Sequence, residues 1–312
     1  MAKNGVQFQR GLSLGTFSAL YGTEEQCEAA LFQSRWPHGF LCPRCGGVKH
    51  CRLSGRRYQC AACKHQASLT AGTLFHSTKL PLTQWFLAIH LMTSAKNGVS
   101  QLELGRQVGV SVNTAALMYH KIAQTMLERD ESNPLTGEIE MDDAYWGGKK
   151  AGAPGRASPN KIPFVAAVEK RSGKPHRIKL NVVSGFSKDA IRGWSKANLM
   201  KGSHVTSDAL WCFLAVKDAG CTHTAIRVGN SKNPATTAPF NWVNTVLGNL
   251  KTSLKGTFHK LAPHHLERHL AAFVYRFNRR YHLDQLMPRF VHAAAATMPF
   301  PKRLITQAEY CG

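Results

Sequence analysis

Long apolar runs are missing from this 312-residue chain, and so are enough acids to balance its basic residues. No stretch of about 18 apolar residues occurs, so we expect no membrane-spanning helix. Met1-Ala-Lys-Asn-Gly5 has no charged segment leading into an apolar core, so we expect no secretory signal. Only 18 Asp and Glu accompany 40 Lys and Arg, and the net charge is +22. This excess is typical of proteins that bind DNA or RNA, although an anionic membrane surface or a generally basic proteome would also favour it.

Two cysteine pairs stand out among the nine cysteines, Cys42-Pro-Arg-Cys45 and Cys60-Ala-Ala-Cys63. Each Cys-x-x-Cys turn can present two thiolates to one ion, and four thiolates form the tetrahedral site that structural zinc prefers. The 14 residues between the pairs fall just short of the usual spacing. The pattern predicts a zinc ribbon; a rubredoxin-like iron site or four reduced thiols without metal are the alternatives. Nine cysteines without a leader indicate a reducing compartment.

From Leu80 the apolar residues recur at helical spacing. Ser100 and Glu103 form a capping box for a helix that we expect to end near Val108. A Gly109-Val-Ser turn and a second helix to about Gln124 complete a helix-turn-helix pattern. A plain helical hairpin between two domains is the alternative. In the helix-turn-helix interpretation the second helix lays these residues on DNA: Asn113, Thr114, and His120 or Lys121.

After a polar linker at 131–137 the period changes to 2, which predicts strands. Three strands, a helix, a strand and another helix is the order of the RNase H-like fold. The predicted strands are 138–142, 164–169, 177–183, 204–208 and 222–228, with the second and third joined at Ser172-Gly173. The predicted helices are 188–199, 210–219, 241–254 and 263–281.

Two of these strands end in an aspartate, Asp142 on the first and Asp208 on the fourth. The first and fourth strands are neighbours in the RNase H-like fold, so we expect the two carboxylates to meet. Carboxylates suit Mg²⁺, and two such ions can support a phosphodiester displacement. Asp143 is adjacent to Asp142, so its side chain should point to the opposite face and only one of the two should reach a metal. Solvated acids at strand ends are the alternative.

Four segments, which form three motifs, resemble parts of bacterial insertion-sequence transposases that carry an N-terminal zinc ribbon. Glu140-Met-Asp-Asp-Ala-Tyr-Trp-Gly-Gly-Lys149 resembles their Glu-x-Asp-Glu-Thr-Tyr-x-Gly-Gly-Lys run, and Val205-Thr-Ser-Asp208 resembles their second-aspartate motif. Lys255-Gly-Thr-Phe-His259 and Phe273-Val-Tyr-Arg-Phe-Asn-Arg-Arg280 resemble their C-terminal signature. The resemblance covers roughly residues 40–281.

This resemblance implies that Asp142 and Asp208 are the first two catalytic carboxylates. Counting back from His259 puts the third position on Asn244, where most of the family has Glu and some branches have Asn or His. An Asn carbonyl can coordinate Mg²⁺ without adding charge, although Asn also suits a helix N-cap. Lys251, two turns further along the same helix, would contact a DNA phosphate. Other phosphate contacts would come from Arg268, Arg276, Arg279 and Arg280.

The implied function is a DNA transposase that binds the terminal inverted repeats of an insertion sequence and catalyses Mg²⁺-dependent strand cleavage and strand transfer. It would hold structural Zn²⁺ and catalytic Mg²⁺, bind double-stranded DNA at element ends and target, and act as a homo-oligomer in the cytoplasm, associated with the nucleoid when bound to DNA. A DNA-binding regulator with an inactive nuclease-like domain is the main alternative, and a nuclease of the same fold that lacks strand transfer is another.

The expected fold class is α/β, with a zinc ribbon and a helix-turn-helix preceding an RNase H-like catalytic domain with a mixed sheet. The expected organisation is an N-terminal segment at 1–34, the zinc ribbon at 35–78, the helical DNA-binding region at 79–130, the catalytic domain at 135–285 and a C-terminal tail at 286–312.

Overall fold

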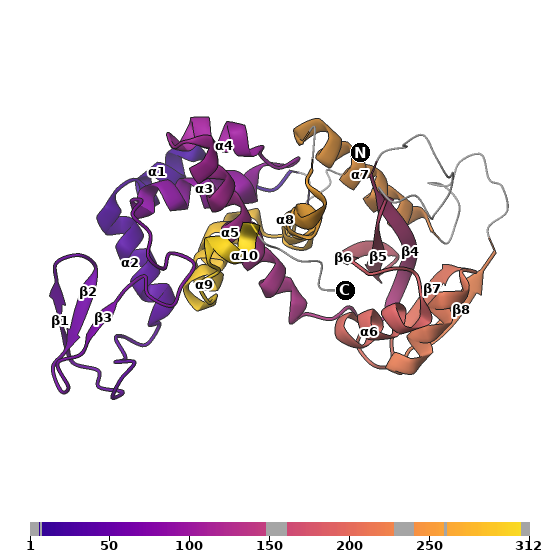
Figure 1. Ribbon diagram of the computed structural model, residues 1–312, viewed down its shortest axis with the longest axis horizontal. Helices are drawn as coiled ribbons and strands as arrows, with labels where there is room; N and C mark the ends of the chain where they lie inside the picture. The colour runs from indigo at the N-terminus through magenta and orange to yellow at the C-terminus, as the bar shows by residue number, and fades with distance from the viewer. Residues whose placement is uncertain (1–5, 7, 148–160, 228–239, 259–260, 307–312) are drawn as a thin grey trace. The chain divides into compact units, whose positions relative to one another are not determined.

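A computed structural model describes residues 6, 8–147, 161–227, 240–258 and 261–306 (Figure 1). Chain contacts divide the protein into two compact units. The first contains residues 1–125 and 279–307, and the second contains residues 126–278 and 308–312. Within the described ranges, no helix combines the length and the apolar composition needed to cross a bilayer.

The first unit contains the cysteine ribbon, a three-stranded antiparallel sheet of β1 (His50–Leu53), β2 (Arg57–Cys60) and β3 (Gln66–Ser68). The helix α2 (Glu24–Arg35) packs against this small sheet through aromatic rings. Phe32 on α2 lies with its ring centroid 5.0 Å from that of Tyr58 on β2, and Trp36 lies 5.6 Å from the same ring. The ribbon therefore completes its core with a helix from the segment that the sequence analysis left unassigned.

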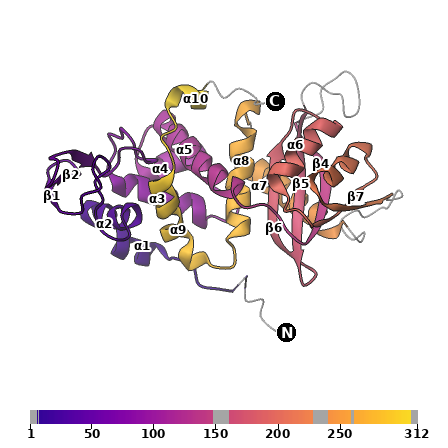
Figure 2. The same cartoon turned by 90° about the horizontal axis from the view of Figure 1, so that it is seen from below.

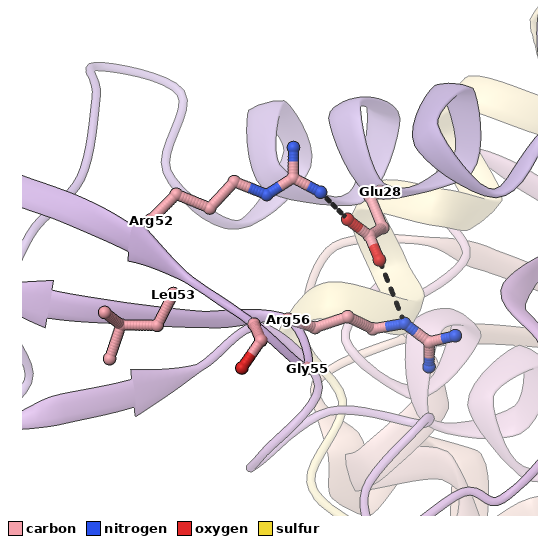
Figure 3. A pocket seen from close by; sticks show the side chains of 6 residues that line it. Glu28, Arg52, Leu53, Gly55 and Arg56 are labelled. Atoms are coloured by element: carbon pink, nitrogen blue, oxygen red, sulfur yellow. Dashed lines mark hydrogen bonds and ion pairs between the residues drawn. The ribbon is translucent and has the colours of Figure 1, made fainter.

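Charged groups join α2 to β1 and to the turn that follows it. Glu28 on α2 accepts hydrogen bonds from Arg52 and, at 3.1 Å, from Arg56 Nε, as Figure 3 shows. The Glu28 side chain is only 11% exposed. A hollow of about 640 Å³ lies beside these contacts, lined by Glu28, Arg52, Leu53, Ser54, Gly55 and Arg56. Because the carboxylate is largely withdrawn from water, its two arginine partners are needed to stabilise its charge.

The helix α3 (Leu82–Ser94) packs against several helices of the first unit and starts after Pro81 without a side-chain cap of its own. Glu24 of α2 supplies that cap, because its carboxylate accepts the backbone N–H groups of Leu82 at 2.9 Å and Thr83 at 3.1 Å. The other helices of the unit are α1 (Leu14–Tyr21), α4 (Gln101–Val108), α5 (Val112–Glu131, which continues into the second unit), α9 (Leu286–Ala296) and α10 (Lys302–Thr306).

Two features of these helices bear on the sequence predictions. α4 ends at Gly109, whose φ of 75° is the left-handed conformation that closes a helix, and α5 begins at Val112. The predicted pair of helices around this turn is therefore present. The segment expected as a tail instead contains α9, which packs against α2 and α3 and buries Leu286, Met287 and Phe290.

The second unit is built on a five-stranded mixed sheet in the order β6-β5-β4-β7-β8. β4 pairs antiparallel with β5 and parallel with β7; β5 pairs antiparallel with β6, and β7 parallel with β8. Ser172 and Gly173, both at positive φ, make the predicted turn between β5 and β6. This arrangement confirms the predicted RNase H-like sheet. The strands are β4 (Glu138–Trp146), β5 (Ile162–Arg171), β6 (Lys174–Val182), β7 (His204–Asp208) and β8 (Thr222–Ile226).

Each face of the sheet carries its own helices, and the alternation along β4 assigns its residues to the two faces (Figures 1 and 2). Ala144 belongs to the core under α7 (Asn241–Thr257) and α8 (Leu266–Asn278). Ile139 and Met141 belong to the core under α6 (Lys188–Asn198) and the 3₁₀ helix η1 (Trp211–Ala219). Even-numbered residues of β4 therefore face α7, and odd-numbered residues face α6.

The edge strand β6 is held by a side chain from α8. The Asn278 carboxamide accepts the Ile178 N–H at 2.8 Å and donates to the Ile178 carbonyl at 3.1 Å. One side chain thus pairs with both backbone groups of a single edge residue, in the manner of a neighbouring strand. Asn278 lies in the motif that resembles the C-terminal signature, so part of that motif has a role in the sheet.

The contact between Glu28 and its two arginines leads to a stability prediction. Replacing Glu28 by Gln removes a largely buried charge that accepts two charge-assisted hydrogen bonds, so the ribbon should lose about 1–3 kcal/mol of unfolding free energy. Glu25→Gln, on an exposed position of the same helix, is the matched control and should leave stability unchanged. Thermal unfolding and hydrogen exchange of the β1 and β2 amides measure the difference; equal stability of the two variants contradicts the assignment.

Candidate functional site

Three acids lie together at the point where β4 and β7 separate. Oxygen atoms of Asp142, Asp143 and Asp208 all lie within 4.8 Å of one another, and all three residues are half-buried. Two oxygens on opposite sides of one Mg²⁺ would be about 4.2 Å apart. The carboxylates therefore have the spacing and the chemistry to share a divalent cation.

The pairing of β4 with β7 explains why Asp142 and Asp208 meet. The two strands run parallel with Met141 opposite Ser207, and both acids are the next residue of their strands. The ladder between them ends at this point, but β4 continues to Trp146 against β5. The predicted end of the first strand at residue 142 was therefore wrong for the strand as a whole, although it marks the end of the pairing with β7.

The sequence predicts that the Asp143 side chain points away from the metal site. Strict alternation puts its side chain on the face opposite Asp142, yet its carboxylate reaches the cluster. The ladder between β4 and β7 ends at Met141 and Ser207, and the Asp143 carboxylate reaches the cluster just beyond that point. Asp142 also bends along the strand, because its Oδ1 accepts the Asp143 N–H at 2.9 Å. The expectation that only one of these two acids could reach a metal was wrong.

Asp208 is held by the residues on either side of it. Its Oδ1 accepts the Leu210 N–H at 3.1 Å, which fixes the side chain as the chain leaves β7. The buried Ser207 hydroxyl donates to the Asp208 carbonyl at 2.7 Å and lies 2.9 Å from Nε2 of His223 on β8. Burial lowers the pKa of His223, so the ring is neutral at pH 7 and its Nε2–H can donate to Ser207.

Glu140 lies two residues before Asp142 on the same face of β4 and contacts the start of α7. Its Oε2 accepts the N–H groups of Trp242 and Val243, both at 3.0 Å, and its Oε1 lies 3.5 Å from Lys170 Nζ. The residue is 1% exposed. Burial raises the pKa of Glu140, while the two N–H groups and Lys170 oppose that rise.

Asn244 follows Val243 and lies in the first turn of α7, which begins at Asn241. The alternative that Asn244 is the helix N-cap is wrong, because Phe240 occupies that position. Asn244 is half-buried, beside the buried stripe of the helix, and Lys251 is exposed two turns further on. His259, Gly148 and Lys149, which belong to the motifs, lie outside the described residues.

The four paired cysteines form the second candidate metal centre. All four sulfurs lie within 4.8 Å of one another, with Cys42 and Cys63 at 3.6 Å and Cys45 and Cys60 at 3.6 Å. Tetrahedral zinc with Zn–S bonds of about 2.3 Å separates its sulfurs by about 3.8 Å. The geometry fits a structural zinc site.

The electrostatics of the cysteine cluster also favour a cation. The Cys63 N–H donates to Cys60 and lowers the pKa of that thiol to about 7. At Cys45 the Gly47 N–H acts in the same direction, but hydrogen bonds with the other cysteine sulfurs raise its pKa to about 12. Four thiolates at this spacing repel one another, so a bound divalent cation is what would allow all of them to ionise.

The predicted DNA-contacting residues of the second helix differ in exposure. Asn113 is exposed and Thr114 is half-buried in the first turn of α5, where Thr114 N–H is capped by Ser111 Oγ at 3.3 Å. Lys121 is half-buried, and burial lowers its pKa. His120 is 4% exposed, and its Nε2 lies 3.0 Å from Gln101 Nε2. His120 is therefore a packing residue of the helical pair and does not face solvent.

The basic residues in and near the C-terminal signature differ in exposure and in the unit to which they belong. Arg268 is 5% exposed, and its Nη1 lies 3.0 Å from His265 Nδ1, so the predicted contact of Arg268 with a DNA phosphate is wrong. Arg276 is half-buried on α8 in the second unit. Arg279 and Arg280 are half-buried and belong to the first unit, where the Arg280 guanidinium lies 4.3 Å from the Tyr281 ring centroid.

Two family models match the chain. An ISXO2-like transposase domain of the IS1595 type matches residues 134–278, and a transposase zinc-ribbon domain of the same type matches residues 22–66. Together they cover more than half of the chain. The second match begins before α2, in agreement with the packing of that helix against the ribbon.

A curated relative from Halobacterium salinarum, described as an uncharacterized protein in transposable element ISH50, is 29% identical over 139 residues. The match covers 43% of this chain and 45% of the relative, so the chain spans less than half of that protein's length.

Among solved structures, the Mos1 strand transfer complex matches with a TM-score of 0.23 and 11% identity, over 70% of this chain and 79% of that one. A Mos1 paired-end complex with the left transposon end matches with a TM-score of 0.23 and 9% identity, over 68% and 79% of the two chains.

The two family models confirm the sequence resemblance, and the structure clusters four cysteines in the ribbon and three acids where β4 and β7 separate. The chain belongs to the IS1595 family of transposases, with a zinc-ribbon domain and an ISXO2-like catalytic domain.

Proposed function

We propose that this protein is a DNA transposase that cuts at the ends of an insertion sequence and joins the freed ends to target DNA. The observation that carries the proposal is the cluster of Asp142, Asp143 and Asp208, whose oxygens lie within 4.8 Å of one another in a domain of this family. The occurrence of the curated relative in a transposable element supports the same function.

In this proposal the three carboxylates and the Asn244 side-chain carbonyl hold Mg²⁺. When bound, Mg²⁺ would lower the pKa of a water or a 3′-hydroxyl and stabilise charge on the phosphate oxygens. Asn244 adds a ligand but no charge, so the three acids must supply the charge of the site. Asp143 is therefore a direct ligand in this proposal, because a site of only two acids and one Asn would have one negative charge fewer.

The chemistry consists of two displacements at phosphorus. Water attacks the phosphodiester at the element end, the P–O3′ bond breaks, and a 3′-hydroxyl and a 5′-phosphate result. The 3′-hydroxyl then attacks a phosphodiester of the target, and the target's own 3′ oxygen leaves. Lys251, exposed two turns from Asn244 on α7, would hold a DNA phosphate during both steps.

We assign recognition of the terminal inverted repeats to the zinc ribbon and to the helix pair α4–α5, with the exposed Asn113 and the half-buried Thr114 at the start of α5. Lys121, Arg276, Arg279 and Arg280 would contribute phosphate contacts. An insertion element has two ends, and the described part of one chain holds one acidic cluster, so the proposal includes a homo-oligomer on DNA.

The acidic cluster gives the first prediction of this proposal. Asp142→Asn, Asp143→Asn and Asp208→Asn should each reduce Mg²⁺-dependent cleavage by more than about 100-fold, because loss of a direct ligand costs more than the 10- to 100-fold typical of an outer partner. Binding to end DNA should persist. The assay measures nicking and joining of a duplex that carries the element's own terminus, in Mg²⁺ and in Mn²⁺.

Asp218→Asn is the control, because Asp218 is an exposed acid of the same unit that pairs with Arg192. Wild-type cleavage by Asp208→Asn contradicts the site. Binding without cleavage by the wild-type protein would instead favour the DNA-binding regulator, and cleavage without joined products would favour a nuclease.

The cysteine cluster predicts one zinc per chain in protein purified without a chelator. Cys60→Ser should lose the metal and unfold the ribbon, because structural zinc contributes on the order of 10 kcal/mol to such small modules. Cys51→Ser, an exposed cysteine on β1 of the same ribbon, should keep the zinc. Elemental analysis measures the ratio, and well under one zinc per wild-type chain would count against the site.

The net charge of +22 predicts strongly salt-dependent DNA binding. With six or more phosphates neutralised, log affinity should fall with log salt at a slope of about −5 or steeper. Arg279→Ala should make the slope less steep by about 1. Asn113→Ala should weaken DNA binding and leave the slope unchanged. Fluorescence anisotropy over a KCl series measures both; a nearly flat titration rejects an electrostatic interface.

A further inference from the structure

The first turn of α7 is capped by a residue from another element. Phe240 at the N-cap position forms no side-chain hydrogen bond to the helix, so the amides of the first turn need partners from elsewhere. Glu140 on β4 supplies one oxygen, Oε2, to both Trp242 N–H and Val243 N–H at 3.0 Å. A carboxylate also interacts favourably with the positive end of the helix dipole.

The Glu140 cap is a tertiary contact, whereas an ordinary helix cap comes from the residue at the N-cap position itself. Ser, Thr, Asp or Asn at position 240 would satisfy the same amides locally. Such a residue would stabilise α7 without fixing where the helix lies on the sheet. Glu140, by contrast, is 1% exposed within β4, so its bonds fix the start of the helix to that strand. Its other oxygen lies 3.5 Å from Lys170 on β5, which balances the buried charge.

A second contact acts on the same turn. Trp242 Nε1 donates to the Gly173 carbonyl at 2.8 Å, at the turn between β5 and β6. The start of α7 is therefore tied to the sheet at two separate places. The residue that follows these anchors is Asn244, and the residue two positions beyond Glu140 on the same face of β4 is Asp142. Two residues of a strand span about 7 Å.

We propose that Glu140 is a positioning residue that sets the location of Asn244 relative to Asp142. The inference rests on the proposed function, in which both residues hold the same metal site. Glu140 touches neither metal nor DNA in this role; it acts through the first turn of α7. The neutral Asn ligand makes this positioning important, because a carboxylate in its place would be drawn to the cation by charge, and an amide is drawn far less.

The test compares variants that separate the hydrogen bonds of Glu140 from its charge. Glu140→Ala removes both. Glu140→Gln keeps a carbonyl oxygen that can accept both amides but removes the charge. Glu140→Asp keeps the charge but shortens the side chain by one methylene, so it should reach the amides poorly. Glu169→Gln is the matched control, because Glu169 is a carboxylate of β5 that is 2% exposed, faces α6, and binds Arg177 and the Thr136 N–H.

Three measurements are made on each full-length variant: the Mg²⁺ concentration for half-maximal cleavage, the stabilisation of the protein by Mn²⁺ in thermal unfolding, and the exchange of the Trp242 and Val243 amides. Glu140→Ala should raise the Mg²⁺ requirement by about 10-fold or more, weaken the Mn²⁺ effect, and speed exchange at both amides. Glu140→Asp should behave similarly. Glu140→Gln should stay within about threefold of wild type, as should Glu169→Gln, even if the latter lowers the unfolding temperature.

A wild-type metal requirement in Glu140→Ala overturns the proposal, and so does one in Glu140→Asp. A defect in Glu140→Gln as large as in Glu140→Ala also overturns it, because charge rather than position would then be the cause. If Glu140→Ala does not fold, the Asp and Gln variants decide. If the wild-type protein fails to cleave DNA in either Mg²⁺ or Mn²⁺, the proposed function is contradicted. Unchanged exchange of the Trp242 and Val243 amides in Glu140→Asp contradicts this inference alone.

Discussion

The parallel pairing of β4 with β7 is the contact on which the acidic centre depends. It brings together strands that are distant in the sequence, and its register sets Asp142 beside Asp208. Its early end matters as much as its register. Beyond Met141 the strand β4 continues against β5 after its pairing with β7 has ended, and there the Asp143 carboxylate reaches the same cluster. A longer ladder would keep the two adjacent acids on opposite faces of a closed sheet.

Both units use a buried or half-buried glutamate to start a helix that lacks a cap of its own. Glu24 binds the first amides of α3, and Glu140 binds those of α7. In each case the carboxylate comes from a different element, so a single contact both satisfies the helix end and fixes its position. The chain has few acids, and several of them are used to join its elements.

Sequence patterns predicted the features that depend on the spacing of residues along the chain. They missed the features that depend on which strands and helices are neighbours in the fold. The cysteine pairs and the strand ending at Asp208 follow from local residues, and the structure agrees. The extension of β4 to Trp146 depends on β5, and the convergence of Asp143 depends on where β7 stops. The helix α2 was missed even though Thr23 and Gln26 form a capping box, a local signal of its start. The burial of Arg268 follows from packing that no local pattern records.

The Asn278 clamp on β6 has a consequence for folding during synthesis. Ile178 and Asn278 are 100 residues apart in the chain. At about 5–20 residues per second, the ribosome needs about 5–20 s to make the intervening segment. Throughout that interval Ile178 at the outer edge of the nascent sheet lacks this partner. The sheet can assemble early, but its edge is closed at this position only when the end of α8 emerges, and until then the nascent chain has an open strand to which another chain can pair.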